Sequence, residues 1–341
     1  MYSRLSRRAF VGAATATLAA PSVLRAAEPL KFRWSLDTAP SHPRNVAVVD
    51  YVAKLEKATN GALVGEVFHS GQLFPDLNVS KALTQGQVEM ATPGAWTLTG
   101  FVPDADMVQL PYFYGQPTEV THKASDGKPG AHVNAQLEAK LKTHVLGPWI
   151  DLGYQNWYST KTPLDKFESL KGLKIRSPGG AGISWRIKFA GGIANTTAWP
   201  NVPLALSQGT FDAFVSTDES CNSAKLWEAG VKYSYADHQF MGQYIPMASK
   251  IFWDKLSADQ RKTMKDLWGE NIAGYRTGSH TSQANARKIL ETNGVKFHDP
   301  SANEAGAVRK AMMGDVDALI KEAKLSKEIV DLVKESVGSA S

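Results

Sequence analysis

The sequence predicts an α/β protein of two lobes with a long helix that spans both. Strand-like and helix-like segments alternate along most of the 341 residues, which is typical of α/β architecture. After removal of a predicted leader, about 315 residues remain, and a chain of that length exceeds one ordinary hydrophobic core. A short motif also occurs twice, at 82–91 and at 205–214.

The N-terminal segment has the features of a signal peptide. Arg7 and Arg8 form a twin-arginine pattern, an apolar stretch covers 11–24, and a small-residue cleavage site precedes Ala27. These features indicate export by the twin-arginine route. The alternative is a membrane anchor, but the apolar stretch is short for about 30 Å of hydrocarbon. We expect residues 1–26 to be removed and the mature chain to be a soluble protein of the periplasm.

Without this leader the chain is nearly neutral. The leader holds four arginines and no acid, so 38 − 4 = 34 basic residues face 33 acidic ones. No Lys/Arg run follows it, which argues against a nucleic-acid partner. Cys221, the single cysteine, has no disulfide partner within the chain and is expected to be a small buried hydrophobe. The histidines are scattered, and no metal site is expected.

The first two thirds of the chain contain short strands and intervening helices. The predicted elements in order are strand 31–36, helix 45–59, strand 63–68, helix 78–85, helix 118–142, strand 143–150, an extended segment 154–159, strand 173–176, helix 182–190 and strand 193–197. Gly61 and Gly86 follow the ends of the first two helices, where glycine is favoured.

The last third is helical. One helix is predicted over 257–291 with Ser257 as its N-cap, and further helix is predicted over 302–336. A helix of about 35 residues is about 50 Å long, which exceeds one lobe, so it could brace both. No low-complexity linker separates the halves. This favours lobes joined by several crossing strands.

The repeated motif predicts a shared cleft. In each copy a helix ends at a glycine, Gly86 or Gly209, and is followed by a short apolar strand and small polar residues. Ligands bind beyond the carboxyl ends of parallel strands, so one copy in each lobe would direct both ends at one site. Trp96, Trp157 and Trp199 lie near such strand ends, where aromatic rings could line a pocket. The alternative is chance similarity in a common connection.

Motifs of catalysis are absent from the sequence. It contains no G-x-S-x-G, P-loop, H-E-x-x-H or C-x-x-C pattern. The glycine-rich segment 177–182 lacks the order and the lysine of a nucleotide site and is interpreted as a helix entry. Asp218 and Glu219 are adjacent, and adjacent residues on a helix do not face each other. The sequence favours a binding protein without a cofactor over an enzyme.

Three segments carry a resemblance to a known family. They are Ser70-Gly71-Gln72-Leu73, Leu110-Pro111-Tyr112-Phe113 and the stretch from Leu170 to Pro178 that contains Lys174-Ile175-Arg176. Over essentially the whole mature chain, the sequence resembles the solute-binding proteins of TRAP (tripartite ATP-independent periplasmic) transporters, of the C4-dicarboxylate-binding type.

This resemblance implies a class II-like periplasmic binding protein, in which hinge strands join two lobes. Residues 27–153 with about 242–281 would form lobe I, and 154–241 with about 282–341 would form lobe II. The implied partners are a small organic acid and the membrane permease subunits of the transporter. The alternatives are an ABC-type periplasmic binding protein and an enzyme exported by the twin-arginine route.

The resemblance also implies a ligand site. In the family the arginine of the K-I-R segment holds the ligand carboxylate, and here it is Arg176. A second arginine of many members is replaced by Gln155, or by Asn156 if the register slips by one. Ser216 stands where many members have asparagine. The remaining predicted ligand-binding residues are Trp199, Phe74, Gly94 and Trp96. With one cation kept, we expect a monocarboxylate with a less charged, ring-bearing or apolar remainder, bound without a metal or cofactor.

Overall fold

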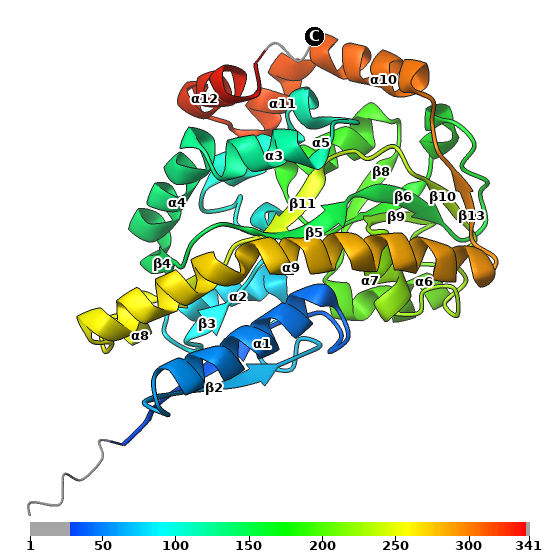
Figure 1. Ribbon diagram of the computed structural model, residues 1–341. Coiled ribbons are helices and arrows are strands. Elements are labelled where there is room, and N and C mark those ends of the chain that lie inside the picture. The colour runs from blue at the N-terminus through cyan, green and yellow to red at the C-terminus, as the bar shows by residue number, and fades with distance from the viewer. Residues whose placement is uncertain (1–27, 339–341) are drawn as a thin grey trace, which may run out of the picture.

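The computed structural model describes residues 28–338, which form two sheets joined by a pair of strands and one long helix (Figure 1). The predicted signal peptide, residues 1–26, lies outside the described residues. Within the described part of the chain, no helix is both long enough and apolar enough to cross a membrane.

The first sheet has five strands in the order β2-β1-β3-β12-β4. Their bounds are β1 Leu30–Ser35, β2 Leu63–Phe68, β3 Met90–Ala91, β4 Thr143–Val145 and β12 Met247–Ser249. β1 pairs in parallel with β2 and β3, while β12 runs antiparallel to its neighbours. Helices α1 (Pro43–Ala58), α2 (Asp76–Thr84) and α8 (Lys250–Trp253) belong to this part of the molecule.

The second sheet has six strands in the order β13-β10-β6-β9-β7-β8. Their bounds are β6 Asn156–Ser159, β7 Lys174–Ser177, β8 Ile193–Thr196, β9 Ala213–Ser216, β10 Tyr233–Tyr235 and β13 Lys296–His298. The connections include helices α5 (Ala181–Phe189), α6 (Val202–Ser207) and α7 (Asp218–Ser223). Both sheets have helices between their strands, as the α/β prediction requires.

Two strands connect the sheets. β5 (Ile150–Tyr154) and β11 (Met241–Tyr244) pair antiparallel, with an irregular register between Gly242 and Gln243. β5 lies between β4 of the first sheet and β6 of the second, and β11 lies between β10 and β12. The chain thus passes from one sheet to the other at two adjacent strands, which is the arrangement expected of a hinge.

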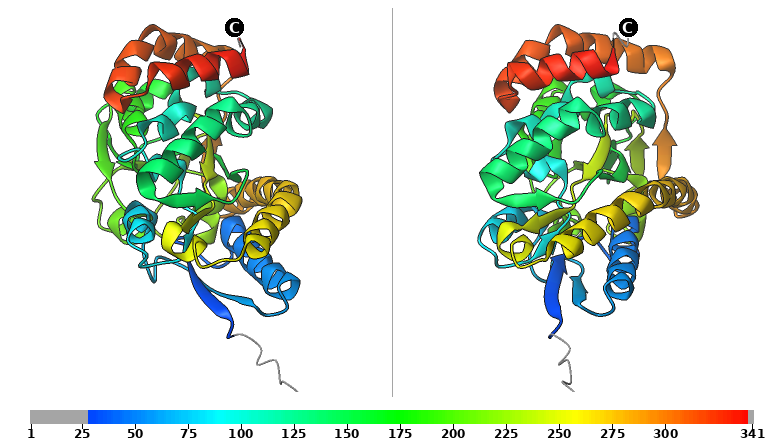
Figure 2. Two further views of the ribbon diagram at one scale, coloured as in Figure 1. Left: turned by 90° about the vertical axis from the view of Figure 1, so that its left-hand side faces the viewer. Right: turned by 60° about the vertical axis from the view of Figure 1, so that its left-hand side comes forward.

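The long helix α9 (Ala258–Thr292) braces both parts and crosses the middle of the molecule (Figures 1 and 2). Ser257 and Gln260 form a capping box at its start. Near this end the Tyr51 hydroxyl of α1 donates to the Met264 carbonyl at 2.9 Å. Towards the other end the Gln283 amide donates to Leu152 O of β5 at 2.6 Å and accepts from Glu219 N of α7 at 2.9 Å.

Three predicted elements were wrong in extent. The helix expected over 118–142 is two helices, α3 (Thr118–Ser125) and α4 (Lys128–Leu141), because Gly127 is extended and Pro129 lies in the first turn of α4. The strand expected over 143–150 is β4 followed, after a break, by β5. The helix expected over 302–336 is three helices, α10 (Ala302–Gly314), α11 (Val316–Ala323) and α12 (Lys327–Val337). Lys324 is left-handed and Ser326 caps the last helix.

The last three helices lie against other helices of the fold (Figure 2). α12 contacts α3 and α4, whereas α11 contacts α5, which follows β7 of the second sheet. The C-terminal segment therefore touches elements on both sides of the hinge, and the lobe boundaries expected from the sequence stay a prediction.

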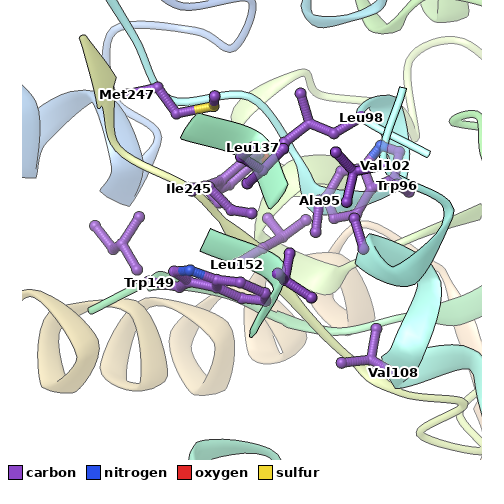
Figure 3. Close-up of a cluster of buried hydrophobic side chains, with 14 of the residues drawn as sticks. Ala95, Trp96, Leu98, Val102, Val108, Leu137, Trp149, Leu152, Ile245 and Met247 are labelled. Atoms are coloured by element: carbon purple, nitrogen blue, oxygen red, sulfur yellow. The ribbon is translucent and has the colours of Figure 1, made fainter. Parts of the chain in front are cut away.

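An apolar cluster lies beside the hinge strands (Figure 3). Trp96, Trp149, Leu152 and Ile245 are all buried. Leu152 comes from β5, and Trp96 lies in the short helix η1 (Ala95–Thr97) that follows β3. This packing fixes the position of η1 against the hinge, and Trp96 and Leu152 also line the cavity described next.

Candidate functional site

The ends of the two repeated motifs meet at one cavity. Gly86 and Gly209 have φ of 68° and 67°, so each motif turns at a left-handed glycine before its strand. The residues after β3 and at the end of β9 line a space of about 420 Å³ that is empty of protein atoms. The lining residues are Asp37, Thr38, Asp76, Leu77, Trp96, Thr97, Leu152, Gln155, Arg176, Pro178, Trp199, Val215, Ser216, Ser220 and Tyr244. The predicted convergence of the two motifs is confirmed.

Five of the eight predicted ligand-binding residues line this cavity. They come from separate elements: Trp96 from η1, Gln155 from the link between β5 and β6, Arg176 from β7, Trp199 from η5 (Trp199–Asn201) and Ser216 from β9. Trp157, in contrast, is wholly buried and donates from Nε1 to Asp237 Oδ2 at 2.8 Å, so it belongs to the core.

Asn156, Gly94 and Phe74 are not among the residues that line the cavity. Successive side chains of an extended segment point to opposite sides. Gln155 faces the cavity, so its neighbour Asn156 faces away from it. Asn156 lines a second cavity behind the hinge and accepts from His238 N at 3.1 Å. Of the two residues expected at this position, Gln155 lines the cleft and Asn156 does not.

Gly94 and Phe74 act behind the cavity wall. A Cβ on Gly94 would lie 2.2 Å from the Trp96 ring, so the absence of a side chain makes room for that ring. The backbone of Phe74 exchanges hydrogen bonds with the Ser35 hydroxyl, at 3.0 Å and 3.2 Å. Both residues therefore position their neighbours.

Arg176 is buried, with 3 % of its surface exposed, and has no carboxylate partner among residues 28–338. Nε donates to Thr197 O at 2.9 Å and Nη1 donates to Val215 O at 3.2 Å. Nη2 donates to no acceptor of the described chain. Burial lowers the pKa of Arg176 to about 10, so the guanidinium remains charged at neutral pH. The Trp199 ring centroid lies 5.5 Å from its Cζ.

A second buried arginine, which sequence reasoning missed, lies behind the cavity wall. Arg44 is wholly buried and forms ion pairs with Asp37 at 2.6 Å and with Asp76 at 2.8 Å. Its other bonds go to Thr38 Oγ1, from Nε and Nη2, and to Thr92 O, from Nη1. These five hydrogen bonds use all five N–H groups that a guanidinium has.

Asp37 and Asp76 place two carboxylates in the cavity wall. Asp37 Oδ2 accepts from the backbone N–H of Asp76 at 3.0 Å, which begins α2. Burial raises the pKa of Asp76 to about 7, although Arg44 opposes that shift. Asp37 follows β1, and Asp76 starts the helix before β3, so both lie at the carboxyl-end edge of the first sheet. That position is the signal by which the sequence could have revealed them.

Neutral polar groups complete the wall. The Nε2 atom of Gln155 is buried without a hydrogen-bond partner in the described structure. The Tyr244 ring stacks on Arg44, whose Cζ lies 3.9 Å from the ring centroid. The Tyr244 hydroxyl forms no hydrogen bond with residues 28–338. The wall thus holds one available guanidinium, two acids, and groups that can both donate and accept.

The two sides of the cleft touch each other. His42 precedes α1 on the side of the first sheet, and its Nε2 lies 3.3 Å from Ser220 Oγ of α7 on the other side. His42 Nδ1 accepts a hydrogen bond from Arg44 N at 3.2 Å. Because Nδ1 accepts, Nε2 carries the proton and donates to Ser220. Gly71, which is left-handed, approaches Pro200 so closely that a Cβ would lie 3.0 Å from its ring. The structure therefore shows the cleft with its sides in contact.

No feature of a metal centre appears at this site. Among residues 28–338, no three His, Cys, Asp or Glu side chains are grouped so that they could hold an ion. Cys221, expected to be buried, is buried and free.

Comparison with known sequences gives a consistent family. The family model described as bacterial extracellular solute-binding protein, family 7, matches residues 35–323. The C4-dicarboxylate-binding periplasmic protein DctP of Rhodobacter capsulatus is 28 % identical over 340 residues, covering 98 % of each chain. The 2,3-diketo-L-gulonate-binding periplasmic protein YiaO of Escherichia coli is 25 % identical over 240 residues, covering 70 % of this chain and 71 % of that protein.

Solved structures share the fold. The sugar acid binding protein DctPAm of Advenella mimigardefordensis, in complex with galactonate, has a TM-score of 0.85 at 23 % identity, and the match covers 92 % of this chain and 99 % of that one. A TRAP periplasmic solute binding protein of Shewanella oneidensis with bound succinate has a TM-score of 0.82 at 20 % identity, with coverage of 91 % and 100 %. The predicted two-lobed α/β fold with a long helix is confirmed.

Proposed function

Because the chain belongs to the bacterial extracellular solute-binding protein family 7, we propose that it is the periplasmic binding subunit of a TRAP transporter and captures a small organic monocarboxylate between its two lobes. It delivers this acid to the membrane permease subunits of the transporter. The twin-arginine segment at Arg7 and Arg8 carries it across the membrane to the periplasm. Proteins of this family are binding proteins, and the chain is not an enzyme.

This proposal rests on the burial of Arg176 and on its incomplete set of hydrogen bonds. A buried guanidinium is costly unless an acceptor or a counter-charge compensates it. Arg176 lines the cavity and donates hydrogen bonds to two backbone carbonyls. Its Nη2 atom has no acceptor in the described chain. A ligand carboxylate supplies both the missing acceptor and the missing charge. The planar fork of arginine suits this group, because it offers parallel N–H bonds to both oxygens.

The number of available arginines supports a single carboxylate. Arg44 lies close behind the wall, but its five N–H groups are already bonded to Asp37, Asp76, Thr38 and Thr92. Among the described residues that line the cavity, only Arg176 is left to pair with a ligand acid. R. capsulatus DctP is named for C4-dicarboxylates, which carry two acids, so our proposal for this chain differs from the ligand of that relative.

A thermal-shift screen against a library of carboxylates tests the proposal. A ligand at 100 times its dissociation constant adds about 2.7 kcal/mol to the folded state, which is readily seen as a rise in melting temperature. The same library applied to Arg176→Ala is the control, and its shifts should be lost. If no carboxylate shifts the wild type, or if the shifts survive in Arg176→Ala, the proposal is wrong.

A further inference from the structure

We infer that the cavity behind the hinge is the counterpart of the cleft: it narrows when the cleft opens, and the side chains that line it set how readily the protein closes. These side chains act as positioning residues for ligand capture without touching a ligand. The inference goes beyond the proposed function, because it concerns residues that do not line the cleft and its test needs no ligand.

The first argument is the position of this cavity. It is a space of about 520 Å³ that is empty of protein atoms, and residues of β5, β11 and α9 line it. Gln155 lines the cleft, whereas its neighbour Asn156 lines the cavity behind the hinge. The two spaces therefore lie on opposite faces of the same segment. When two lobes rotate about the strands that join them, separation on one face brings the lobes together on the other.

The second argument is that the wall of this cavity comes from both sides of the hinge. Asp151 lies near the start of β5, which follows the first sheet, and Asp218 begins α7, which follows β9 of the second. The outer wall is α9. On the first side its Ser279 Oγ donates to Asp151 O at 2.6 Å, and on the second side Arg287 Nη2 pairs with Asp299 Oδ2 at 2.8 Å. About 12 Å of helix separates these anchors, so rotation of the lobes changes the width of the cavity.

The third argument is a pair of glycines in the hinge strands. Gly153 of β5 and Gly242 of β11 are partners in the ladder, and the register becomes irregular directly after Gly242. Gly153 has φ of 132°, which residues with a side chain rarely adopt. A Cβ on Gly153 would lie 2.5 Å from the Gln283 amide, which lines the cavity behind the hinge, and a Cβ on Gly242 would lie 2.8 Å from the Gln155 amide, which lines the cleft. The strands can therefore bend between the two spaces.

Ala284 is the residue at which this coupling can be changed. It lies on an exposed part of α9 and lines the cavity behind the hinge with a single methyl group. A large side chain at this position has room in the closed form shown by the structure, but it meets the opposite wall when the cleft opens. Ala284→Trp should therefore raise the ratio of closed to open protein about fivefold or more. An acid that binds the closed form would then be held more tightly.

Small-angle scattering of the ligand-free protein tests the inference. We expect the wild type to be more extended than the structure described above, and Ala284→Trp to be more compact than the wild type. Asn285→Trp is the matched control, because Asn285 is also exposed on α9 but does not line the cavity, and it should scatter as the wild type does. Melting curves establish folding, and Ala284→Leu repeats the test with less bulk.

Three results would overturn the inference. They are a wild type that is already as compact as this structure, Ala284 variants that fold and scatter as the wild type does, and an Asn285→Trp variant that is compacted equally. Because no acid is present, none of these results bears on the proposed capture of a carboxylate, which the thermal-shift screen tests separately.

Discussion

Replacing Arg176 should abolish tight binding without destabilising the free protein. The residue is 3 % exposed, lines the cleft and pairs with no carboxylate of the described chain. When the ligand carboxylate binds, the two charges are desolvated together, and removing one member of such a pair costs about 2–5 kcal/mol. At tenfold per 1.4 kcal/mol, Arg176→Ala should weaken binding by roughly 30-fold to 4,000-fold.

The conservative change should recover only part of this loss. Lysine restores the charge, but its ammonium is a point charge on a flexible stem and cannot repeat the bonds to Thr197 O and Val215 O together with two parallel bonds to the ligand. The melting temperature of ligand-free Arg176→Ala should stay the same or rise, because an uncompensated buried charge is removed. Calorimetry and thermal melting of the two variants provide both readouts.

A second buried arginine supplies the control. Arg186 is wholly buried, and burial lowers its pKa to about 10 as well, but it donates to Gln109 O and Gln239 O away from the cleft. Arg186→Lys should lower stability and leave the affinity of the folded protein unchanged. If Arg176→Ala and Arg176→Lys both bind within about threefold of the wild type, or if Arg186→Lys loses affinity equally, Arg176 is not the carboxylate anchor.

Three further changes test other parts of the site. Trp199→Ala should weaken binding by about 2-fold to 13-fold, which is the range expected for an aromatic contact. The melting temperature of the free protein should stay nearly unchanged. A large loss of stability with normal affinity would place Trp199 in the core. Gly94→Ala should displace the Trp96 ring, since the added Cβ would lie 2.2 Å from it, and both the tryptophan fluorescence and the affinity should change. Burial raises the pKa of Asp106 to about 7, so this group stabilises the fold at low pH, and that contribution is lost as pH rises from about 4 to about 7. Asp106→Asn should therefore reduce the fall in melting temperature between about pH 5 and about pH 8, and an unchanged fall would show that Asp106 is ionised throughout.

The elements that the sequence predicted well have strong local signals. Strand β2 is at 63–68 as expected, and α9 begins after Ser257 with the expected cap. The wrong extents all arise where a break depends on one or two residues inside a helical or apolar pattern, as at Gly127 before α4 and at Lys324 before α12. A lysine in the left-handed conformation has no sequence signature, because the conformation is imposed by the packing of the helices it joins.

The site was predictable where it follows from strand ends and from the family motif. Arg176 and Trp199 were found in this way, and both line the cleft. Arg44 was missed because nothing in the local sequence distinguishes a buried charge from an exposed one, and Asp76 was missed although it lies at the carboxyl-end edge of the first sheet. Asp76 stands at the start of a helix, where an acid is common on the surface. Only the arrangement of α1 against α2 shows that Arg44 and Asp76 are partners.

The contrast between Arg176 in the cavity wall and Arg44 behind it accounts for the proposed selectivity for a single carboxylate. Arg44 and Arg176 are both buried beside the same cavity, but acids of the protein surround the first and backbone carbonyls surround the second. The first is neutralised when the protein folds, and only the second remains to be neutralised by a ligand. Under the proposed function, the two aspartates therefore limit the ligand to one carboxylate, which the arginine motif alone does not reveal. A relative with the same arginine motif but without acids at the positions of Asp37 and Asp76 would have a second cation available, and its cleft would suit a dicarboxylate.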